Sequence, residues 1–307
     1  QWFQWSLEAN DYLIDSAQRS VLFWDVLRRR GNNYLRHLRR GQPPVLVFDY
    51  ETVLDGHSLE RPVNYALVRI TDRRSRQSDS SGSLPSATGS ERRHRSQAAA
   101  EAPKAVSRPI VIIDPRAGHG PGIGGAKQDS QIGMALDAGH PVYFMIFSTR
   151  PVKGQSLADV RDAQIRFVET VRSRHPDAPK PAVIGNCQGG WAAALIGAER
   201  PDLVGPMVFN GSPLSYWGGV QGTSSLRYRG GLMGGAWLAS LISDIGNGEF
   251  DGVHLVANFE DLNPANTLWG KQYHLFANID TEESRYLDFE RWWGGFFRMS
   301  AGEIHTI

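Results

Sequence analysis

Between residues 109 and 210 the sequence alternates short, continuously apolar runs with longer amphipathic ones, and this alternation constrains the fold most strongly. Strands are predicted at 110–113, 141–147, 182–184 and 205–210, and helices at 130–138, at 157–174 and from Gly189 onward. Strands that are buried on both faces read as unbroken apolar runs, whereas half-exposed strands alternate apolar and polar residues. The pattern therefore predicts an α/β fold, in which helices cover both faces of a parallel sheet.

The residues before this region predict helices followed by strands. Residues 7–30 carry apolar side chains at spacings of three and four, which predicts a long amphipathic helix whose regular part ends at Gly31. A second short helix is expected at 33–40, and strands are expected at 45–48 and 63–70. The arginine cluster within 28–40 indicates a solvated helix face, with an anionic partner as the alternative.

Two segments depart from this regular pattern. Residues 71–108 are rich in Arg, Ser, Gly and Pro and nearly lack large apolar side chains, so we predict a disordered basic insertion. Residues 212–307 are rich in tryptophan and glycine, which indicates inserted helices with an aromatic core, a cap over an apolar acyl-binding pocket, or both. The predicted organisation is a helical segment at 1–44, first strands at 45–70, the insertion at 71–108, the sheet core at 109–211 and a cap-like region at 212–307.

Composition narrows the class of protein. The chain has 307 residues, of which 41% are hydrophobic and 21% charged, as in ordinary globular proteins. A net charge of +1 argues against nucleic acid as the main partner. No apolar run approaches the roughly 20 residues that a membrane span needs. A single cysteine permits no internal disulfide, so we expect a cytoplasmic protein.

The single cysteine, Cys187, stands between the strand predicted at 182–184 and the helix predicted from Gly189. Gly185 and Gly189 lie two residues to either side of it, and Gly190 follows. This is the layout of a nucleophile elbow, in which glycines let two backbone segments pass closely. A thiol at a helix N-terminus meets the positive end of the helix dipole, which favours the reactive thiolate. The alternative is a buried cysteine that packs as a small hydrophobic side chain.

The motif around Cys187 resembles the elbow of α/β-hydrolases, and within that superfamily the poly(3-hydroxyalkanoate) synthases. The residues at 59–65, 114–125, 211–217 and 263–269 resemble an uncharacterised bacterial family of synthase-like proteins. The resemblance implies an acyl-transfer enzyme of α/β-hydrolase fold that forms a covalent acyl-enzyme from a hydroxyacyl thioester, an ester or a polyester. No cofactor and no metal is expected. The expected partner is the small-molecule substrate, and the chain could also form a homo-oligomer.

The resemblance also implies roles for individual residues. Cys187 would attack the carbonyl, a histidine would move the proton, and an acid would orient the imidazole. Backbone N–H groups of Gln188 and of the loop containing Gly118 and His119 would stabilise the oxyanion. A plain turn is the alternative for His119. For Asp114 we expect structural capping at the end of the strand, with anchoring of the loop as the alternative.

The acid and the histidine should follow the nucleophile in the chain, each on a loop after a late strand. None of the candidates has that setting, namely His254, His274, His305, Asp244, Asp251, Asp261 and Asp280. We therefore expect a C-terminally truncated chain, with the acid and the base beyond Ile307. Two other functions stay open, which are a small-ester hydrolase of the dienelactone hydrolase kind and a non-catalytic binding or granule-associated protein on the same fold.

Overall fold

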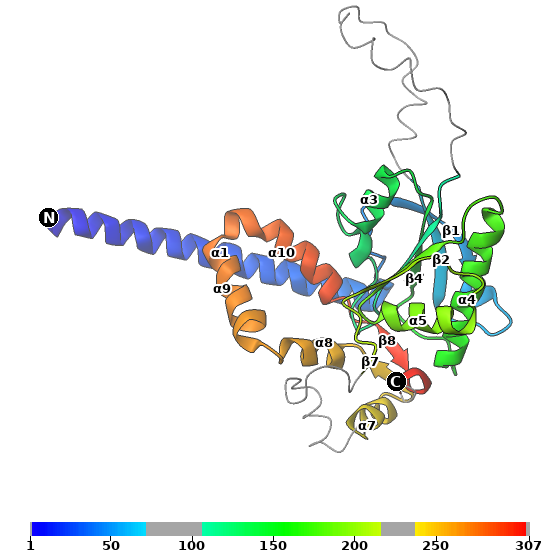
Figure 1. Cartoon of the computed structure of the whole chain (residues 1–307). Coiled ribbons are helices and arrows are strands. Elements are labelled where there is room, and N and C mark those ends of the chain that lie inside the picture. The colour runs from blue at the N-terminus through cyan, green and yellow to red at the C-terminus, as the bar shows by residue number, and fades with distance from the viewer. Residues whose placement is uncertain (1, 72–105, 216–236, 305–307) are drawn as a thin grey trace, which may run out of the picture.

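The computed structural model describes residues 2–71, 106–215 and 237–304. Within these ranges a six-stranded sheet has the order β1-β2-β4-β3-β5-β6 (Figure 1). Its strands are β1 (Asp49–Asp55), β2 (Tyr65–Thr71), β3 (Ile110–Ile113), β4 (Val142–Phe147), β5 (Ala182–Asn186) and β6 (Met207–Asn210). Strands β4, β3, β5 and β6 run parallel, and β1 and β2 form an antiparallel edge. The mostly parallel sheet predicted from residues 109–210 is therefore confirmed.

Helices cover both faces of the sheet, because successive side chains of each strand point to opposite faces. Val111 and Ile113 are buried on the face covered by α4 (Leu157–Arg174) and α5 (Gly189–Glu199). Ile112, between them, is buried on the face covered by α3 (Gln131–Asp137). Burial of each such aliphatic side chain stabilises the fold by about 1.5–3 kcal/mol.

Helix α4 spans Leu157–Arg174, the range predicted from its periodicity. Its first turn forms a capping box, in which Ser156 Oγ accepts from the Asp159 amide at 3.2 Å and Asp159 accepts from the Ser156 amide at 2.9 Å. Hydrogen bonding to Arg61 lowers the pKa of Asp159 to about 2. Local sequence thus fixes where this helix begins.

The first strand differs from the prediction. Residues 45–48 form no strand, although Val45 and Val47 donate backbone hydrogen bonds to Pro121 and Gly125. Strand β1 instead begins at Asp49, and most of its side chains are exposed. It lies at the edge of the sheet and pairs with β2 alone, so it needs no apolar run. The prediction of a strand at 45–48 was wrong because it relied on apolar residues, which an exposed edge strand does not need.

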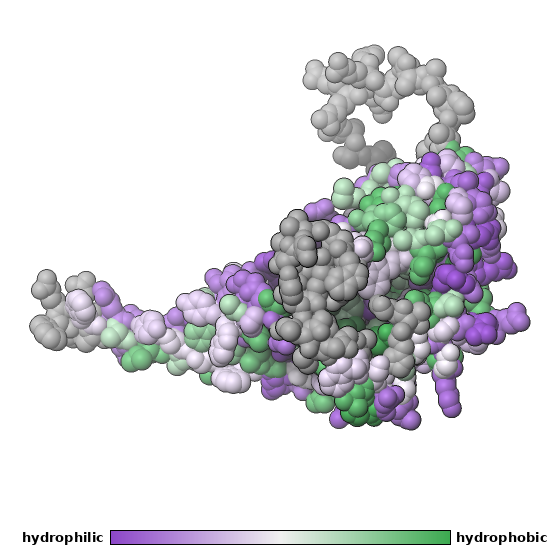
Figure 2. Space-filling view, turned by 60° about the horizontal axis from the view of Figure 1, so that its bottom comes forward, coloured by the Kyte–Doolittle hydropathy of each residue, from purple (hydrophilic) through white to green (hydrophobic). Residues whose placement is uncertain are grey.

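The N-terminal segment is one continuous helix, α1 (Trp2–Arg40), and the predicted break at Gly31 is wrong. Glycine costs a helix interior about 1 kcal/mol relative to alanine. Packing against α9 (Lys271–Ala277) and α10 (Ile279–Trp293) outweighs this cost, with Val26 1% exposed in a shared core. Arg30 adds an ion pair to buried Glu290 at 2.6 Å. The first half of α1 projects beyond the rest of the molecule (Figures 1 and 2).

Two short 3-10 helices span Gly56–Ser58 and Ile123–Gly125, and the other elements lie between residues 237 and 304. They are α7 (Trp237–Ile245), β7 (Glu249–Asp251), α8 (Val253–Glu260), a π-helical turn (Ala265–Gly270), α9, α10, β8 (Arg298–Ser300) and α11 (Ala301–Ile304). Strands β7 and β8 pair in a small antiparallel sheet. In the described ranges, no helix is both long enough and apolar enough to cross a membrane. The predicted insertion at 71–108 lies almost entirely outside the described residues, and so does Trp217.

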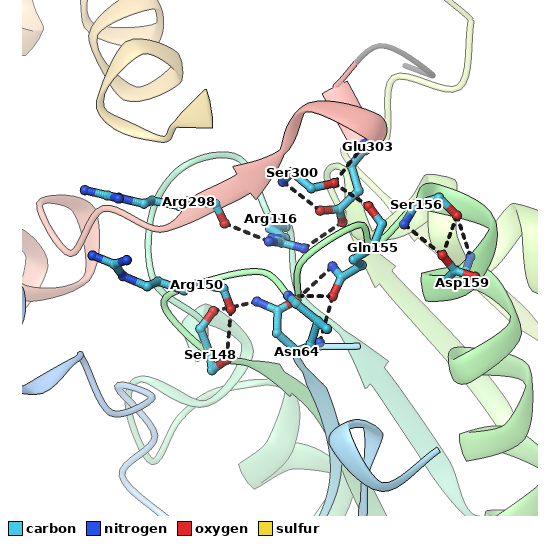
Figure 3. A network of polar contacts seen from close by, with 11 residues as sticks. Asn64, Arg116, Ser148, Arg150, Gln155, Ser156, Asp159, Arg298, Ser300 and Glu303 are labelled. Carbon is cyan, nitrogen blue, oxygen red and sulfur yellow. Dashed lines mark hydrogen bonds and ion pairs between the residues drawn. The ribbon is translucent and has the colours of Figure 1, made fainter. Parts of the chain in front are cut away.

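A buried polar network joins this C-terminal segment to the large sheet (Figure 3). Arg116, in the loop after β3, donates to Glu303 Oε1 at 2.7 Å and to the carbonyl oxygen of Arg298 at 2.7 Å. The Arg116 and Glu303 side chains are each 6% exposed. Gln155 links Ser300 to Asn64 at the start of β2. Residues 298–303 are therefore held at the same edge of the sheet as the loop after β3.

Candidate active site

Cys187 occupies the turn between β5 and α5 and has a φ of 51°. Left-handed backbone is uncommon for a residue with a side chain and costs about 1–3 kcal/mol when the surroundings hold it. Two backbone hydrogen bonds hold this turn, from the Cys187 amide to Asn210 O at 2.8 Å and from the Gly190 amide to Cys187 O at 2.9 Å. The thiol is half-buried. Strand, turn and helix are thus present as predicted, and the turn presents the thiol at the carboxyl end of β5.

The three glycines around Cys187 stand where side chains do not fit. A Cβ on Gly185 would lie 2.5 Å from Gly190 Cα, and one on Gly189 would lie 2.2 Å from the carbonyl oxygen of Ile113. A Cβ on Gly190 would lie 1.9 Å from Ser212 Oγ. The close passage of β5, α5 and β3 at this turn therefore depends on glycine, as an elbow requires.

Cys187 lines a cavity of about 540 Å³ at the carboxyl ends of β3, β5 and β6. Pockets of this size and position commonly hold small ligands in α/β proteins. Part of its wall is apolar, formed by Ala117, Ile123, Phe259, Trp292 and Trp293. The polar part contains His119, Lys127, Ser130, Gln131, Asn186 and Asn210. An apolar group can thus be accommodated beside the thiol.

Asp114 holds the glycine-rich loop that borders this cavity. Its carboxylate is 4% exposed and accepts from the amides of Gly122 at 2.6 Å and Ile123 at 2.7 Å. Burial raises the pKa of Asp114 to about 6, although these hydrogen bonds oppose the rise. Asp114 therefore anchors the loop after β3 through amides eight to ten residues ahead of it, which is the alternative to the local capping that we expected.

An amide network next to Cys187 was not found from the sequence. Asn186 is 6% exposed and exchanges two hydrogen bonds with Gln131, at 2.8 and 2.7 Å. The side-chain amide of Asn210 donates to Asn186 Oδ1 at 3.2 Å, and Asn186 Nδ2 donates to Asp114 Oδ1 at 3.4 Å. The network links the ends of β3, β5 and β6 to α3, and no spacing in the sequence could have indicated it.

His119 packs against the two tryptophans of the cavity wall. Its ring centroid is 4.2 Å from that of Trp292 and 5.8 Å from that of Trp293. Nδ1 is 3.0 Å from Gly120 O, and because a carbonyl oxygen only accepts, Nδ1 carries the proton and Nε2 does not. Burial lowers the pKa of His119 to about 4, so the ring is neutral near pH 7.

Gln188 and Gly118, the other residues predicted to stabilise the oxyanion, do not line the cavity beside Cys187. Gln188 precedes α5, and its side chain lines a smaller cavity of about 70 Å³ together with Arg116 and Glu303. Gly118 has a φ of 93°, and its carbonyl oxygen accepts from the Phe297 amide at 2.9 Å. A Cβ on Gly118 would lie 2.3 Å from Gly252 O, so this glycine serves a close backbone contact. Gly118 is not one of the described residues that line the cavity beside Cys187.

Among the described residues, none of the candidate aspartates and histidines that follow Cys187 in the chain lies beside its thiol. His254 is exposed on α8, and His274 is exposed on α9 with Glu282 at 3.7 Å. Asp251 caps the start of α8 through the Val253 amide at 3.0 Å. None of the four aspartates lines the cavity, and His305 lies outside the described residues. The described ranges also contain no group of three His, Cys, Asp or Glu residues that could hold a metal.

Comparisons with known proteins place the chain in a family. Residues 15–85 and 94–307 match the family described as "Protein of unknown function (DUF3141)". The chain is 49% identical over 301 residues to an "Uncharacterized protein in ackA 5'region" of Rhizobium meliloti. This similarity covers 98% of the chain and 38% of the relative, so the chain spans well under half of the relative's length. The chain therefore belongs to the uncharacterised DUF3141 family.

Proposed function

We propose that this chain carries the nucleophile of an acyl-transfer enzyme of the α/β-hydrolase type that resembles polyhydroxyalkanoate synthases. The observation that carries the proposal is the strained backbone of Cys187, with a φ of 51°, at the wall of a cavity of about 540 Å³. In α/β-hydrolases the nucleophile stands on such a strained turn between a strand and a helix. The loop after the third strand supplies an oxyanion donor in those enzymes, and the loop after β3 borders the cavity here.

The reaction is a transfer of an acyl group through sulfur. The Cys187 thiolate forms a bond to the carbonyl carbon of a hydroxyacyl thioester or ester, and the bond to the leaving thiolate or alkoxide breaks. The leaving group takes up the proton that the thiol released. A hydroxyl group of an acceptor or water then attacks the acyl carbon, the bond from this carbon to sulfur breaks, and the hydroxyl proton restores the thiol. The apolar wall formed by Phe259, Trp292 and Trp293 supports an apolar acyl group as the part held beside the thiol.

Oxyanion stabilisation is assigned to backbone N–H groups of Gln188 and of the loop containing Gly118 and His119. Within that loop we favour His119, since it lines the cavity whereas Gly118 packs against Gly252. The His119 imidazole is a poor general base, because a pKa of about 4 lies far below the operating pH. We place the acid and the base of the reaction outside the described residues.

The test is acylation of Cys187 by a chromogenic acyl thioester. We expect release of the coloured thiol and a mass increase equal to the acyl group, mapped to the peptide that contains Cys187. The Cys187→Ala variant should show neither. The urea-unfolded chain is the control for intrinsic thiol reactivity and should react more slowly than the folded chain. Equal rates for folded and unfolded chain, or an adduct on lysine instead, would refute the proposal.

One observation favours a second function, a non-catalytic binding protein on the same fold. In the described ranges no acid–histidine pair reaches Cys187, although the cavity is well formed. On this alternative, an apolar acyl compound binds without acylation and changes the fluorescence of Trp292 and Trp293. Alkylation of folded Cys187 by iodoacetamide should then be no faster than that of free cysteine at the same pH, whereas an activated nucleophile reacts faster.

A further inference from the structure

The outer face of α1 carries a line of exposed apolar side chains. Leu7, Ile14, Val21 and Leu35 fall on a seven-residue repeat and are 50, 49, 71 and 48% exposed. Trp24 and Leu38, each three residues after a position of this repeat, are 68 and 62% exposed. We name the repeat the outer seam, and its positions are Leu7, Asn10, Ile14, Ala17, Val21, Trp24, Arg28, Gly31, Leu35 and Leu38. Hydrophobic residues are visible along the projecting helix in Figure 2.

A seven-residue repeat of this kind is the pattern of helix pairing. Positions spaced alternately by three and four residues stay on one line only when two helices wind around each other in a left-handed coiled coil. The outer seam runs from Leu7 to Leu38, a length of about 48 Å at 1.5 Å per residue. Exposed apolar surface of this extent marks an interaction site.

The charges of α1 indicate what kind of helix fits the outer seam. Glu8 and Asp11 lie near its N-terminal end, and Arg36, Arg39 and Arg40 lie at its C-terminal end. No ion pair to these five residues occurs within the described part of the chain. A second α1 in antiparallel orientation would bring the acidic end of each helix beside the basic end of the other. A parallel copy would place like charges together.

We propose that the outer seam binds the outer seam of a second copy of this chain, with the two helices antiparallel. Aligning Val21 of one copy with Trp24 of the other sets a larger side chain against a smaller one in the three central layers. Ile14 then faces Gly31, and Ala17 faces Arg28, while Leu7 meets Leu38 and Asn10 meets Leu35. A parallel pair would instead set Trp24 against Trp24 and Arg28 against Arg28. This proposal does not rest on the function proposed for Cys187.

Sedimentation velocity across a dilution series tests the dimer. We expect a reversible dimer, and we expect Val21→Glu to raise its dissociation constant by about 100-fold or more, because a charge would be buried without a partner. Tyr12→Glu is the matched control, because Tyr12 is also 71% exposed on α1 but lies off the outer seam. Circular dichroism would verify that both variants keep the helix. A chain that is monomeric at every concentration, or a dimer that Val21→Glu leaves intact, overturns the proposal.

Charge reversal and a distance measurement test the orientation. Glu8→Arg with Asp11→Arg should weaken the dimer, and adding Arg36→Glu and Arg39→Glu to the same chain should restore it. A spin label at Tyr12→Cys, in a Cys187→Ser background, should lie about 30 Å along the axis from its copy in the antiparallel pair. A label pair with almost no axial separation would mean a parallel dimer and would overturn the proposal, as would failure of the fourfold reversal to restore the dimer.

Discussion

Replacement of Gly189 by alanine tests the elbow more directly than any change of the thiol. A Cβ at this position would lie 2.2 Å from the carbonyl oxygen of Ile113. This distance is more than 1 Å short of an ordinary contact, and both partners belong to backbone, so β3 and α5 must separate. Forced overpacking of this kind costs about 1–3 kcal/mol. Any gain from the better helix propensity of alanine is smaller than about 1 kcal/mol.

Gly31→Ala is the matched control, because Gly31 also lies in a helix but a Cβ there would meet nothing within 4 Å. In the monomer, at low protein concentration, we expect it to raise the free energy of unfolding by about 0.5–1 kcal/mol through helix propensity alone. Gly189→Ala should lower the free energy of unfolding by about 1–3 kcal/mol. The same substitution thus has opposite signs at two glycines of one chain.

Urea unfolding followed by circular dichroism at constant pH measures both free energies. The alkylation rate of Cys187 by iodoacetamide gives a second reading, because movement of α5 changes the turn that holds the thiol. The reasoning is refuted if Gly189→Ala is as stable as the original chain, or if Gly31→Ala destabilises it by a similar amount.

Two further predictions concern buried charges. The pKa of Asp114 is raised from 3.8 to about 6 in the folded chain, so folding favours the protonated carboxyl. The contribution of Asp114 to the free energy of unfolding is therefore fully present below pH 4 and is lost as the pH rises through 6. Relative to Asp114→Asn, the chain should therefore lose about 2 kcal/mol of unfolding free energy between pH 4 and 7, measured by urea titration, and a constant difference would contradict the assignment. Arg116→Met leaves Glu303 charged and buried and should cost about 3–5 kcal/mol, whereas Arg116→Met with Glu303→Leu should recover most of it. Equal losses in the single and the double variant would count against that ion pair.

Local signals in the sequence predicted the part of the fold that depends on neighbouring residues. Helix α4 was predicted at its observed bounds, since amphipathic periodicity is a local signal. Strands β3, β4 and β5 were found because they lie inside the sheet and read as apolar runs. Strand β6 was also found from its apolar residues, although Val208 and Phe209 are 47 and 41% exposed at the edge of the sheet. Strand β1 was missed because an exposed edge strand such as Asp49–Asp55 has no such run.

The end of the N-terminal helix was predicted wrongly for a different reason, because helix propensity ignores tertiary contacts. Gly31 was expected to end a helix, yet α1 continues to Arg40 because α9 and α10 pack against it. The contacts that outweigh the cost of glycine come from residues more than 200 positions away, such as Leu275 and Ile279. No window of sequence contains that information.

The candidate site divides in the same way. By itself the sequence predicted the strand, the turn and the helix around Cys187, because these are consecutive residues with strong local signals. Only the tertiary structure decided what surrounds the thiol. Asn186, Trp292 and His119 meet there because parallel strands end at one edge of the sheet and because the end of α10 lies at the cavity wall. Contacts across such sequence separations follow from packing of the whole chain, so they carry no local pattern that a reader of the sequence could recognise.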